Sequence, residues 1–387
     1  MKPRRYQLRK EAVGAALHHP WIFRSHLSSA AAVFRDGDLL RLVDGQNRIV
    51  GHGFYEASGA IAIRMLRRGS PPPDAAWLRG RIAAAIARRA QLAPRTDGIR
   101  LIHGESDAIP AVAIDRFGDT LVVTSYAAGA DAMARYAARV LAAGPPSPVV
   151  GPARHILLRP AHLRRTPAGP ARALRGAPPD VAHITEDGVP LAIDLAAGQK
   201  TGAYLDLRGL RREIAAAPLA GARVLNLFAY SGMLGRAAER AGAAAIVQVD
   251  ASERALAFAA HHHVDDPARH SFVTADVFAW LPALSSAPFD LVIVDPPAMT
   301  SQASQVPSVL AAYRKLYRAA ARHVRPGGAL VAACCTSRIE RARFHQTVRE
   351  ALGPGFTLDH EIPPEPDHPV GFPQADYLKI GWWKLAG

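Results

Sequence analysis

Cysteine is almost absent from this sequence. Its 387 residues include two cysteines, which are adjacent at Cys334 and Cys335. Two neighbouring cysteines exclude a framework of disulfides and a zinc site built from four cysteines. So little cysteine is typical of proteins in a reducing compartment, and we therefore expect a cytoplasmic protein.

Long apolar runs are also absent. No uninterrupted apolar segment reaches the ~18 residues that a membrane-spanning helix needs, and the first residues, Met1–Gln7, lack the apolar core of a secretory signal. We therefore expect no membrane partner. With 49% hydrophobic and 21% charged residues, the composition is that of a globular protein rather than a disordered or fibrous one. The length predicts two or three domains, at roughly 100–200 residues each.

Acidic residues are scarce in the first half of the chain. Residues 1–175 hold 27 lysine and arginine residues against 12 aspartate and glutamate residues, a net charge of +15. Residues 176–387 hold 20 against 21, a net charge of −1. Basic charge that is confined to one part of a folded chain favours a polyanionic partner, and first of all a nucleic acid. The alternative is a basic surface that serves only solubility.

Two kinds of pattern follow one another in this basic half. Residues 8–66 combine short apolar runs with frequent turn signals and predict a small all-β module. After a linker at 70–74, residues 77–92 predict a helix that begins a second, α+β segment. The stretch 143–180 is dense in proline, glycine and arginine, which predicts a loop or a domain boundary.

The second half has the pattern of a parallel sheet that is covered on both faces. Continuous apolar runs, separated by helix-length segments, occur at residues 224–228, 245–249, 289–294 and 329–333. Unbroken runs are typical of buried parallel strands, and their alternation with helices predicts a doubly wound α/β fold. We expect a small β domain, a central α+β domain and a doubly wound domain, at residues 1–70, 71–176 and 177–387.

Acidic residues at consecutive strand ends indicate a nucleoside cofactor. The first strand of the sheet leads through Gly232 into a helix, and the second ends in Asp250, where a carboxylate can accept both hydroxyls of a ribose. The third ends at Asp276, which can accept from an adenine amine. The glycines do not form the G-x-G-x-x-G pattern of a pyrophosphate site, so a cofactor without phosphates, such as S-adenosylmethionine, is favoured. The alternative is that these are ordinary aspartates at strand ends.

The next strand delivers a rigid carboxylate to the same edge of the sheet. It ends in Asp295, which is followed by Pro296 and Pro297. Two prolines restrict the backbone and would hold the carboxylate beside the methyl donor; the alternative is a capped turn. In amine methyltransferases an aromatic residue usually ends this motif, and Ala298 at that position weakens the case for methylation of an exocyclic nitrogen.

The two cysteines end the fifth strand of the predicted sheet, at the same edge as Asp295. Carbon C5 of a pyrimidine is too weak a nucleophile to take a methyl group directly. A thiolate that adds to C6 turns the ring into an enamine whose C5 can attack, and the thiol is later eliminated. A cysteine of this kind needs an accessible, readily ionised thiol. The alternative is a small apolar side chain in the core.

Further short motifs extend the pattern over essentially the whole chain. In the first half they are His19–Phe23, Gly37-Asp38, Gly51–Tyr55, Gly104–Pro110 and Asp115–Asp119. In the second half they are Gly198–Gly202, Leu205–Arg208, Asn226–Gly232, Asp295–Pro297, Asp367–Pro369 and Tyr377–Lys379. Together these segments resemble the RlmI type of bacterial large-subunit ribosomal RNA cytosine-C5 methyltransferases.

The resemblance implies a PUA-like RNA-binding domain, a central domain and an S-adenosylmethionine-dependent methyltransferase domain that acts on large-subunit (23S) ribosomal RNA. The cofactor site that it implies comprises Lys200, Arg208, Phe228, Tyr230, Gly232, Asp250, Asp276 and Asp295. Catalysis would fall to Cys335 as the nucleophile and to Asp295 at the base, with Cys334 as the alternative nucleophile. No metal is expected, because the consecutive histidines 261–263 would point in different directions on a helix. A homodimer stays open.

Two other functions stay open on the sequence alone. Related multidomain enzymes that methylate guanine share the Leu-Asp-x-Arg and Asp-Pro-Pro elements and need no cysteine. A non-catalytic RNA-binding or ribosome-assembly factor would keep the same fold, but the acids at Asp250, Asp276 and Asp295 argue against it.

Overall fold

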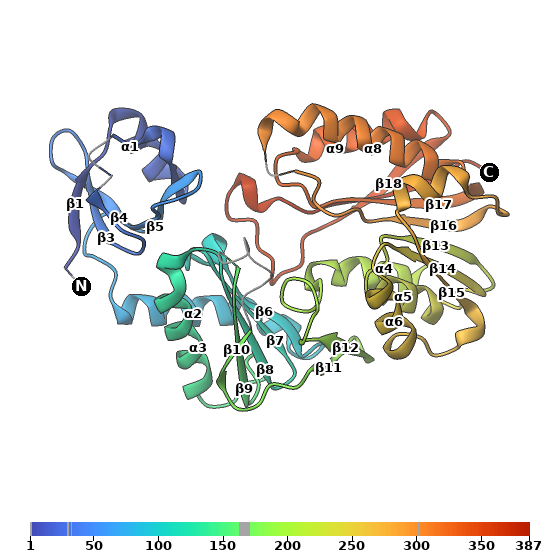
Figure 1. The fold of residues 1–387 in the computed structure, drawn as a ribbon, viewed down its shortest axis with the longest axis horizontal. Coiled ribbons are helices and arrows are strands. Elements are labelled where there is room, and N and C mark those ends of the chain that lie inside the picture. The colour runs from blue at the N-terminus through green and yellow to red at the C-terminus, as the bar shows by residue number, and fades with distance from the viewer. Residues whose placement is uncertain (1, 29–30, 32, 162–170, 301) are drawn as a thin grey trace. The chain divides into compact units, whose positions relative to one another are not determined.

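The computed structural model describes residues 2–28, 31, 33–161, 171–300 and 302–387. The chain divides into two compact units, whose helices and strands are labelled in Figure 1. Residues 1–205 and 366–372 form the first unit, and residues 206–365 and 373–387 form the second. Within the described residues, no helix is long and apolar enough to cross a membrane.

The first unit opens with a five-stranded sheet in the order β1-β3-β4-β5-β2. Its strands are β1 (Arg4–Gln7), β2 (Trp21–Phe23), β3 (Leu39–Val43), β4 (Ile49–Tyr55) and β5 (Ile61–Arg68). Helix α1 (Lys10–His18) shares the core of this sheet, so the prediction of an all-β module over residues 8–66 was incomplete. The sequence hides this helix because its buried residues are Ala12 and Ala16, which give only a weak apolar signal.

A second five-stranded sheet follows, in the order β10-β9-β8-β7-β6. Its strands are β6 (Gly98–His103), β7 (Val112–Phe117), β8 (Thr120–Ser125), β9 (His155–Pro160) and β10 (Arg172–Arg175). The α-helices of this part of the chain are α2 (Ala75–Arg88) and α3 (Asp131–Ala143). Asp74 precedes helix α2 as its N-cap, because its Oδ1 accepts the N–H of Trp77 at 2.7 Å. Side chains of α2, α3 and the sheet share one apolar core.

The stretch 143–180 is not the loop that its composition predicts. It contains β9, which pairs with β8 in parallel and with β10 in antiparallel orientation. The buried middle of β9 is the run 156–158, which is too short to stand out between proline- and glycine-rich flanks. Residues 162–170 of the predicted loop lie outside the described residues. A hairpin of β11 (Val181–Glu186) and β12 (Val189–Asp194) follows.

The segment 366–372 joins the first unit from far along the chain. Its residue Asp367 is fully buried, and Oδ2 of Asp367 accepts the main-chain N–H of Arg100 at 2.9 Å. The main-chain carbonyl of Asp367 accepts from the Arg89 guanidinium at 3.1 Å. Arg89 also donates to both carboxylate oxygens of the buried Asp107, at 2.9 and 2.7 Å. The Asp-His-Pro motif is therefore part of the core of the first unit.

The second unit is built on a seven-stranded sheet in the order β15-β14-β13-β16-β17-β19-β18. Its strands are β13 (Arg223–Leu227), β14 (Ala245–Asp250), β15 (His270–Thr274), β16 (Phe289–Val294), β17 (Val324–Cys334), β18 (Phe356–Ile362) and β19 (Lys379–Leu385). Neighbours from β15 to β17 are parallel, and β19 is antiparallel to both β17 and β18. The four apolar runs of the second half are all strands of this sheet.

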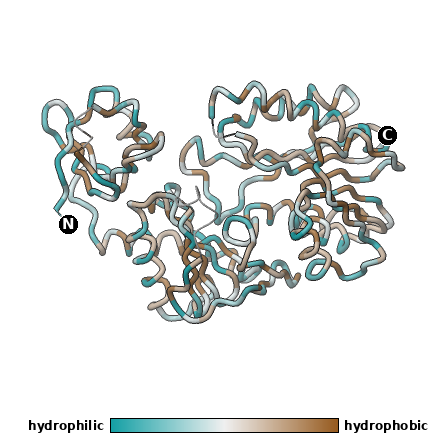
Figure 2. The backbone as a smooth tube through the Cα atoms, viewed as in Figure 1, coloured by the Kyte–Doolittle hydropathy of each residue, from teal (hydrophilic) through white to brown (hydrophobic). Residues whose placement is uncertain are grey.

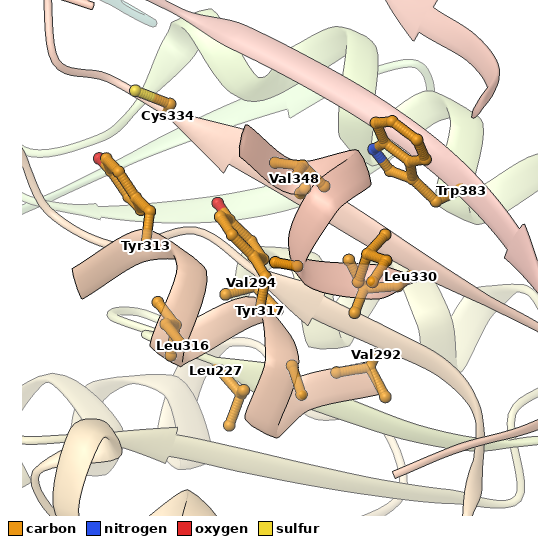
Figure 3. Close-up of a cluster of buried hydrophobic side chains, with 14 of the residues drawn as sticks. Leu227, Val292, Val294, Tyr313, Leu316, Tyr317, Leu330, Cys334, Val348 and Trp383 are labelled. Atoms are coloured by element: carbon orange, nitrogen blue, oxygen red, sulfur yellow. The ribbon is translucent and has the colours of Figure 1, made fainter. Parts of the chain in front are cut away.

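Among the described residues, the second unit has six α-helices. They are α4 (Arg208–Ala216), α5 (Met233–Arg240), α6 (Glu253–His262), α7 (Val277–Trp280), α8 (Val306–Ala321) and α9 (Arg341–Leu352). Figure 3 shows Leu316 and Tyr317 of α8 in the same apolar cluster as Val292 and Val294 of β16. In Figure 2, drawn in the same view as Figure 1, hydrophobic residues recur along the strands of the sheets. This packing keeps the parallel strands rigid and fixes the positions of the residues at their ends.

Candidate active site

The carboxyl ends of the parallel strands β13 to β17 meet at one edge of the second unit's sheet. Chain order changes direction at this edge, because β13 is flanked by β14 on one side and by the later strand β16 on the other. Open α/β sheets bind ligands in the crevice outside such a switch point. Asp250, Asp276, Asp295 and Cys335 are at or just beyond the carboxyl ends of four of these strands.

The loop after β13 has an unusual backbone. Phe228, Tyr230 and Gly232 adopt φ values of 60°, 48° and 74°, in the left-handed region. For residues with a side chain this conformation costs about 1–3 kcal/mol and is concentrated at functional sites. Phe228 packs against the apolar core and lies edge-on to Phe278, with ring centroids 5.7 Å apart. The predicted cofactor loop is therefore a strained turn held by packing, a feature that the sequence did not reveal.

Gly232 is required at its position for two reasons. Its φ of 74° disfavours any side chain, and a Cβ at this residue would lie 2.7 Å from Cβ of Ala259 on α6. Gly232 is also the N-cap of α5. The glycine therefore lets the start of α5 pack closely, and its role toward a cofactor stays a prediction.

Asp250 and Asp276 both accept main-chain N–H groups. Oxygens Oδ2 and Oδ1 of Asp250 accept from Tyr230 at 2.9 Å and from Ser252 at 2.8 Å. Asp276 is exposed and caps α7 by accepting the N–H of Phe278 at 2.9 Å. Because a carboxylate offers about four acceptor positions, each of these acids keeps capacity for a ligand hydroxyl or amine.

Asp295 and the two cysteines come together at the ends of adjacent strands. Strands β16 and β17 are paired so that Val294 lies beside Ala332. The Cys335 thiol donates to the main-chain carbonyl of Pro296, with a sulfur–oxygen distance of 3.6 Å. Cys335 is half-buried, whereas Cys334 is fully buried and belongs to the apolar core. One of the two thiols is therefore in contact with the Asp-Pro-Pro motif.

Two buried tyrosines of α8 lie beneath the cysteine strand, and sequence reasoning missed both. Tyr317 donates to the carbonyl of Ala333 at 2.6 Å, and the Tyr313 hydroxyl is 3.2 Å from Oγ1 of Thr336. Figure 3 shows Tyr313 pointing toward Cys334. Burial raises the pKa of both phenols, and the adjacent cysteines raise it further. Both hydroxyls therefore stay neutral and hold the strand that carries the cysteines.

The predicted cofactor residues Arg208 and Lys200 have other contacts in the structure. Arg208 is 1% exposed, and its Nη1 is 2.9 Å from Oε2 of Glu365. Lys200 belongs to the first unit, where its Nζ lies 4.3 Å from the ring centroid of Tyr204. The cofactor roles of both residues stay predictions.

A basic cleft of about 1270 Å³ lies in the N-terminal sheet domain, far along the chain from the cysteine strand. Its lining includes five cationic side chains: Arg4, Arg5, Arg9, Lys10 and Arg48. Arg4 stacks on Phe34 with 4.6 Å between the guanidinium carbon and the ring centroid and pairs with Asp38, while Arg48 is 77% exposed and pairs with Asp44 at 2.7 Å. This cleft gives part of the basic charge of residues 1–175 a defined location.

Comparison with known proteins identifies the family. Residues 100–378 match the model of S-adenosylmethionine-dependent methyltransferases, and residues 8–68 match that of PUA-like domains. A Deinococcus radiodurans protein named ribosomal RNA large subunit methyltransferase is 34% identical over 379 residues, which cover 93% of this chain and 92% of that protein. Ribosomal RNA large subunit methyltransferase I of Klebsiella pneumoniae is 30% identical over 375 residues, 93% of each chain. The chain belongs to the RlmI-type ribosomal RNA large-subunit methyltransferases.

Solved structures share the fold of this RlmI-type methyltransferase. A Streptococcus mutans structure described as a SAM-dependent methyltransferase has a TM-score of 0.84 at 19% identity and covers 99% of this chain and 100% of its own. A methyltransferase solved with S-adenosylhomocysteine has a TM-score of 0.85 at 20% identity, with the same coverage. The predicted fold class, with a PUA-like domain, a central domain and a Rossmann-like domain, is confirmed, as is S-adenosylmethionine as the cofactor.

Proposed function

We propose that this RlmI-type enzyme transfers a methyl group from S-adenosylmethionine to C5 of a cytosine in large-subunit (23S) ribosomal RNA, through a covalent adduct with Cys335. The observation that carries the proposal is the contact of the Cys335 thiol with the carbonyl of Pro296, next to Asp295. Cys334 is enclosed in the apolar core instead. The arrangement therefore favours Cys335 over Cys334 as the nucleophile.

In the proposed reaction the thiolate of Cys335 adds to C6 of the cytosine, and the electron pair of the C5–C6 bond moves to C5. Bound S-adenosylmethionine would supply an electrophilic methyl group: C5 would bond to the methyl carbon as the carbon–sulfonium bond breaks and S-adenosylhomocysteine leaves. Loss of the C5 proton to water then re-forms the C5–C6 double bond and expels the thiolate. Asp295 holds the N3 side of the base at the strand edge throughout.

The chemistry of the predicted cofactor residues fits S-adenosylmethionine. Asp250 keeps acceptor positions for two ribose hydroxyls, and Asp276 keeps one for the adenine amine. The left-handed turn at 228–232 brings main-chain atoms to the switch point without a side chain at Gly232. We propose that these residues form the cofactor site together with Arg208, Phe228, Tyr230 and Asp295.

The basic cleft supports the assignment of RNA binding and methyl transfer to different parts of the chain. Its cations would contact RNA phosphates, which fix the orientation of an RNA without reading its sequence. A target base in structured RNA would then have to be flipped out of its stack to reach Cys335. We propose a cytoplasmic enzyme that holds ribosomal RNA with domains 1–70 and 71–176 and performs methyl transfer with domain 177–387.

Replacing Cys335 tests the reaction. We expect Cys335→Ala to lower the rate of methyl transfer at least about a thousandfold, because C5 of a neutral cytosine is too weak a nucleophile without the cysteine adduct. The affinity of the variant for S-adenosylmethionine should stay unchanged. The measurement is incorporation of labelled methyl groups into ribosomal RNA, with the product identified as 5-methylcytidine by mass spectrometry. Cys334→Ala is the matched variant and should retain incorporation.

A trapping experiment tests the adduct itself. An RNA that carries 5-fluorocytidine at the target has no C5 proton to lose, so elimination stops and the enzyme stays linked to the RNA. We expect a stable complex on a denaturing gel with the wild type and none with Cys335→Ala. Full methylation by the Cys335→Ala variant, or a product on guanine, would overturn the proposal.

A further inference from the structure

Lys379 is a fully buried cation beside the cysteine strand. It begins β19 and lies opposite Cys334 in the antiparallel ladder with β17, which brings the two Cα atoms to about 5 Å. Its Nζ donates to the main-chain carbonyls of Thr336 at 2.9 Å, Tyr377 at 2.9 Å and Asp376 at 3.4 Å. These three partners are dipoles rather than anions. The ammonium is thus solvated by carbonyl oxygens while its charge is not neutralised by them.

The surroundings of Lys379 contain few other charges. Asp376 lies nearby, but its carboxylate is bound by the Arg341 guanidinium. The phenols of Tyr313 and Tyr317 are neutral. Burial lowers the pKa of Lys379, and Cys334, Asp376 and Cys335 oppose this effect while Arg341 adds to it. Because Nζ of Lys379 is bound to the carbonyl of Thr336, the residue after Cys335, the ammonium charge lies next to the segment that carries the Cys335 thiol, and a nearby cation favours the ionised form of a thiol.

We propose that Lys379 is a positioning residue that holds the turn after Cys335 through the Thr336 carbonyl and stabilises the thiolate of Cys335. The inference rests on the proposed function, in which that thiolate is the nucleophile. A buried charge costs more free energy than a neutral donor at the same place, so a role limited to hydrogen bonding would not require an ammonium. A nearby cation lowers the pKa of a thiol and so makes a cysteine more reactive at neutral pH.

The same lysine connects the cysteine strand to the Leu-Asp-x-Arg motif. Its Nζ binds the carbonyl of Tyr377, and the hydroxyl of Tyr377 donates to Oδ2 of Asp206 at 2.6 Å. Asp206 and Tyr377 therefore share one hydrogen-bonded chain with Thr336, the residue after Cys335. The Tyr-Leu-Lys motif supplies two members of this chain, Tyr377 and Lys379, although the sequence alone assigned the motif no role.

The test measures ionisation of the Cys335 thiol without RNA or methyl transfer. In a Cys334→Ala background, iodoacetamide alkylates Cys335 as the thiolate displaces iodide and forms a thioether, and mass spectrometry locates the adduct. We expect Lys379→Met to raise the pH midpoint of the alkylation rate by about one unit or more. Lys379→Arg should restore most of the original midpoint, because it returns the charge. Lys384→Met is the matched control, since Lys384 is on the same strand but exposed and paired with Asp359.

Each outcome bears on the proposal. An unchanged midpoint in folded Lys379→Met, or an equal shift in Lys384→Met, would overturn it. If Lys379→Met does not fold, the alkylation of Cys335 in the Cys334→Ala protein is compared between the folded state and the urea-unfolded state. The proposal is overturned if the pH midpoint of alkylation in the folded state is not below that in the unfolded state. This alkylation test can fail independently of the test of the proposed function. Methylation by the Cys335→Ala variant would refute the covalent reaction whatever the effect of Lys379 on the thiol.

Discussion

Gly232 and Gly221 adopt the same φ of 74° in different surroundings. At Gly232 a Cβ would lie 2.7 Å from Cβ of Ala259, whereas at Gly221 it would meet no atom within 4 Å. The left-handed conformation costs a residue with a side chain roughly 1–2 kcal/mol. Overpacking adds roughly 1–3 kcal/mol where neighbours cannot yield. The two positions therefore separate backbone strain from crowding.

This pair gives a prediction for the cofactor loop. We expect Gly232→Ala to lower the free energy of unfolding by about 3 kcal/mol and to weaken S-adenosylmethionine binding, because the start of α5 must shift. Gly221→Ala should cost about 1 kcal/mol and leave cofactor binding unchanged. Urea denaturation and calorimetric titration measure the two quantities. Equal effects of the two substitutions on binding would contradict a role for the packing at Gly232.

The buried pair of Arg208 and Glu365 gives a second prediction at the residue scale. Both side chains are at most 5% exposed, so removal of the carboxylate takes a charged partner away from a buried guanidinium. We expect Glu365→Gln to lower the free energy of unfolding by about 3 kcal/mol. Asp359→Asn breaks the exposed contact with Lys384 and should cost less than about 1 kcal/mol. If chemical denaturation shows equal costs, the buried pair is not a structural anchor.

At the scale of elements, the sequence predicted the parts whose signal is local. Strands β13, β14, β16 and β17 are unbroken apolar runs, and Asp250, Asp295 and Cys335 could be located because each follows or ends such a run. Helix α1 and strand β9 were not predicted. The buried residues of α1 are two alanines, and those of β9 form a run of three, so neither gives a strong apolar signal. The contacts of Tyr313, Tyr317 and Lys379 with the cysteine strand could not be predicted, because they depend on pairing between distant elements.

The basic cleft between β1, α1 and the loop after β3 gives a prediction at this scale. We expect the double variant Arg5→Ala/Arg48→Ala to bind ribosomal RNA more weakly and to lower the slope of log affinity against log salt by about 1.5, as two phosphate contacts are lost. Arg135→Ala/Arg139→Ala removes the same charge from the exposed face of α3 and is the control. A filter-binding series in potassium chloride measures both slopes. Equal slopes would mean that net charge, and not the cleft, sets affinity.

For the whole molecule, three buried histidines predict how stability depends on pH. Burial lowers the pKa of His52, His270 and His345 from the ordinary value of 6.5. Below about pH 6.5 the unfolded chain therefore takes up protons that the folded chain refuses, so stability falls as the pH drops through the lowered pKa values. Each of these histidines lowers the free energy of unfolding by up to about 1.4 kcal/mol for each pH unit of this range.

Urea denaturation between pH 5 and 7.5 measures this dependence. The variants His270→Asn and His345→Asn should each flatten the acid limb of the profile, because the replaced side chain no longer titrates. His18→Gln on the exposed face of α1 is the control, since it removes no buried ring. An acid limb with the same slope in all three variants would show that other groups cause the loss.

The placement of residues 366–372 in the first unit has a consequence for the order of events during synthesis. Residues 1–205 leave the ribosome early, yet the segment whose Asp367 is held by Arg89 and Arg100 follows 160 residues of the second unit. Domains generally fold from the N-terminal end as the chain emerges. The core of the first unit therefore stays incomplete, with the position of Asp367 unfilled, until residues 366–372 have been synthesised.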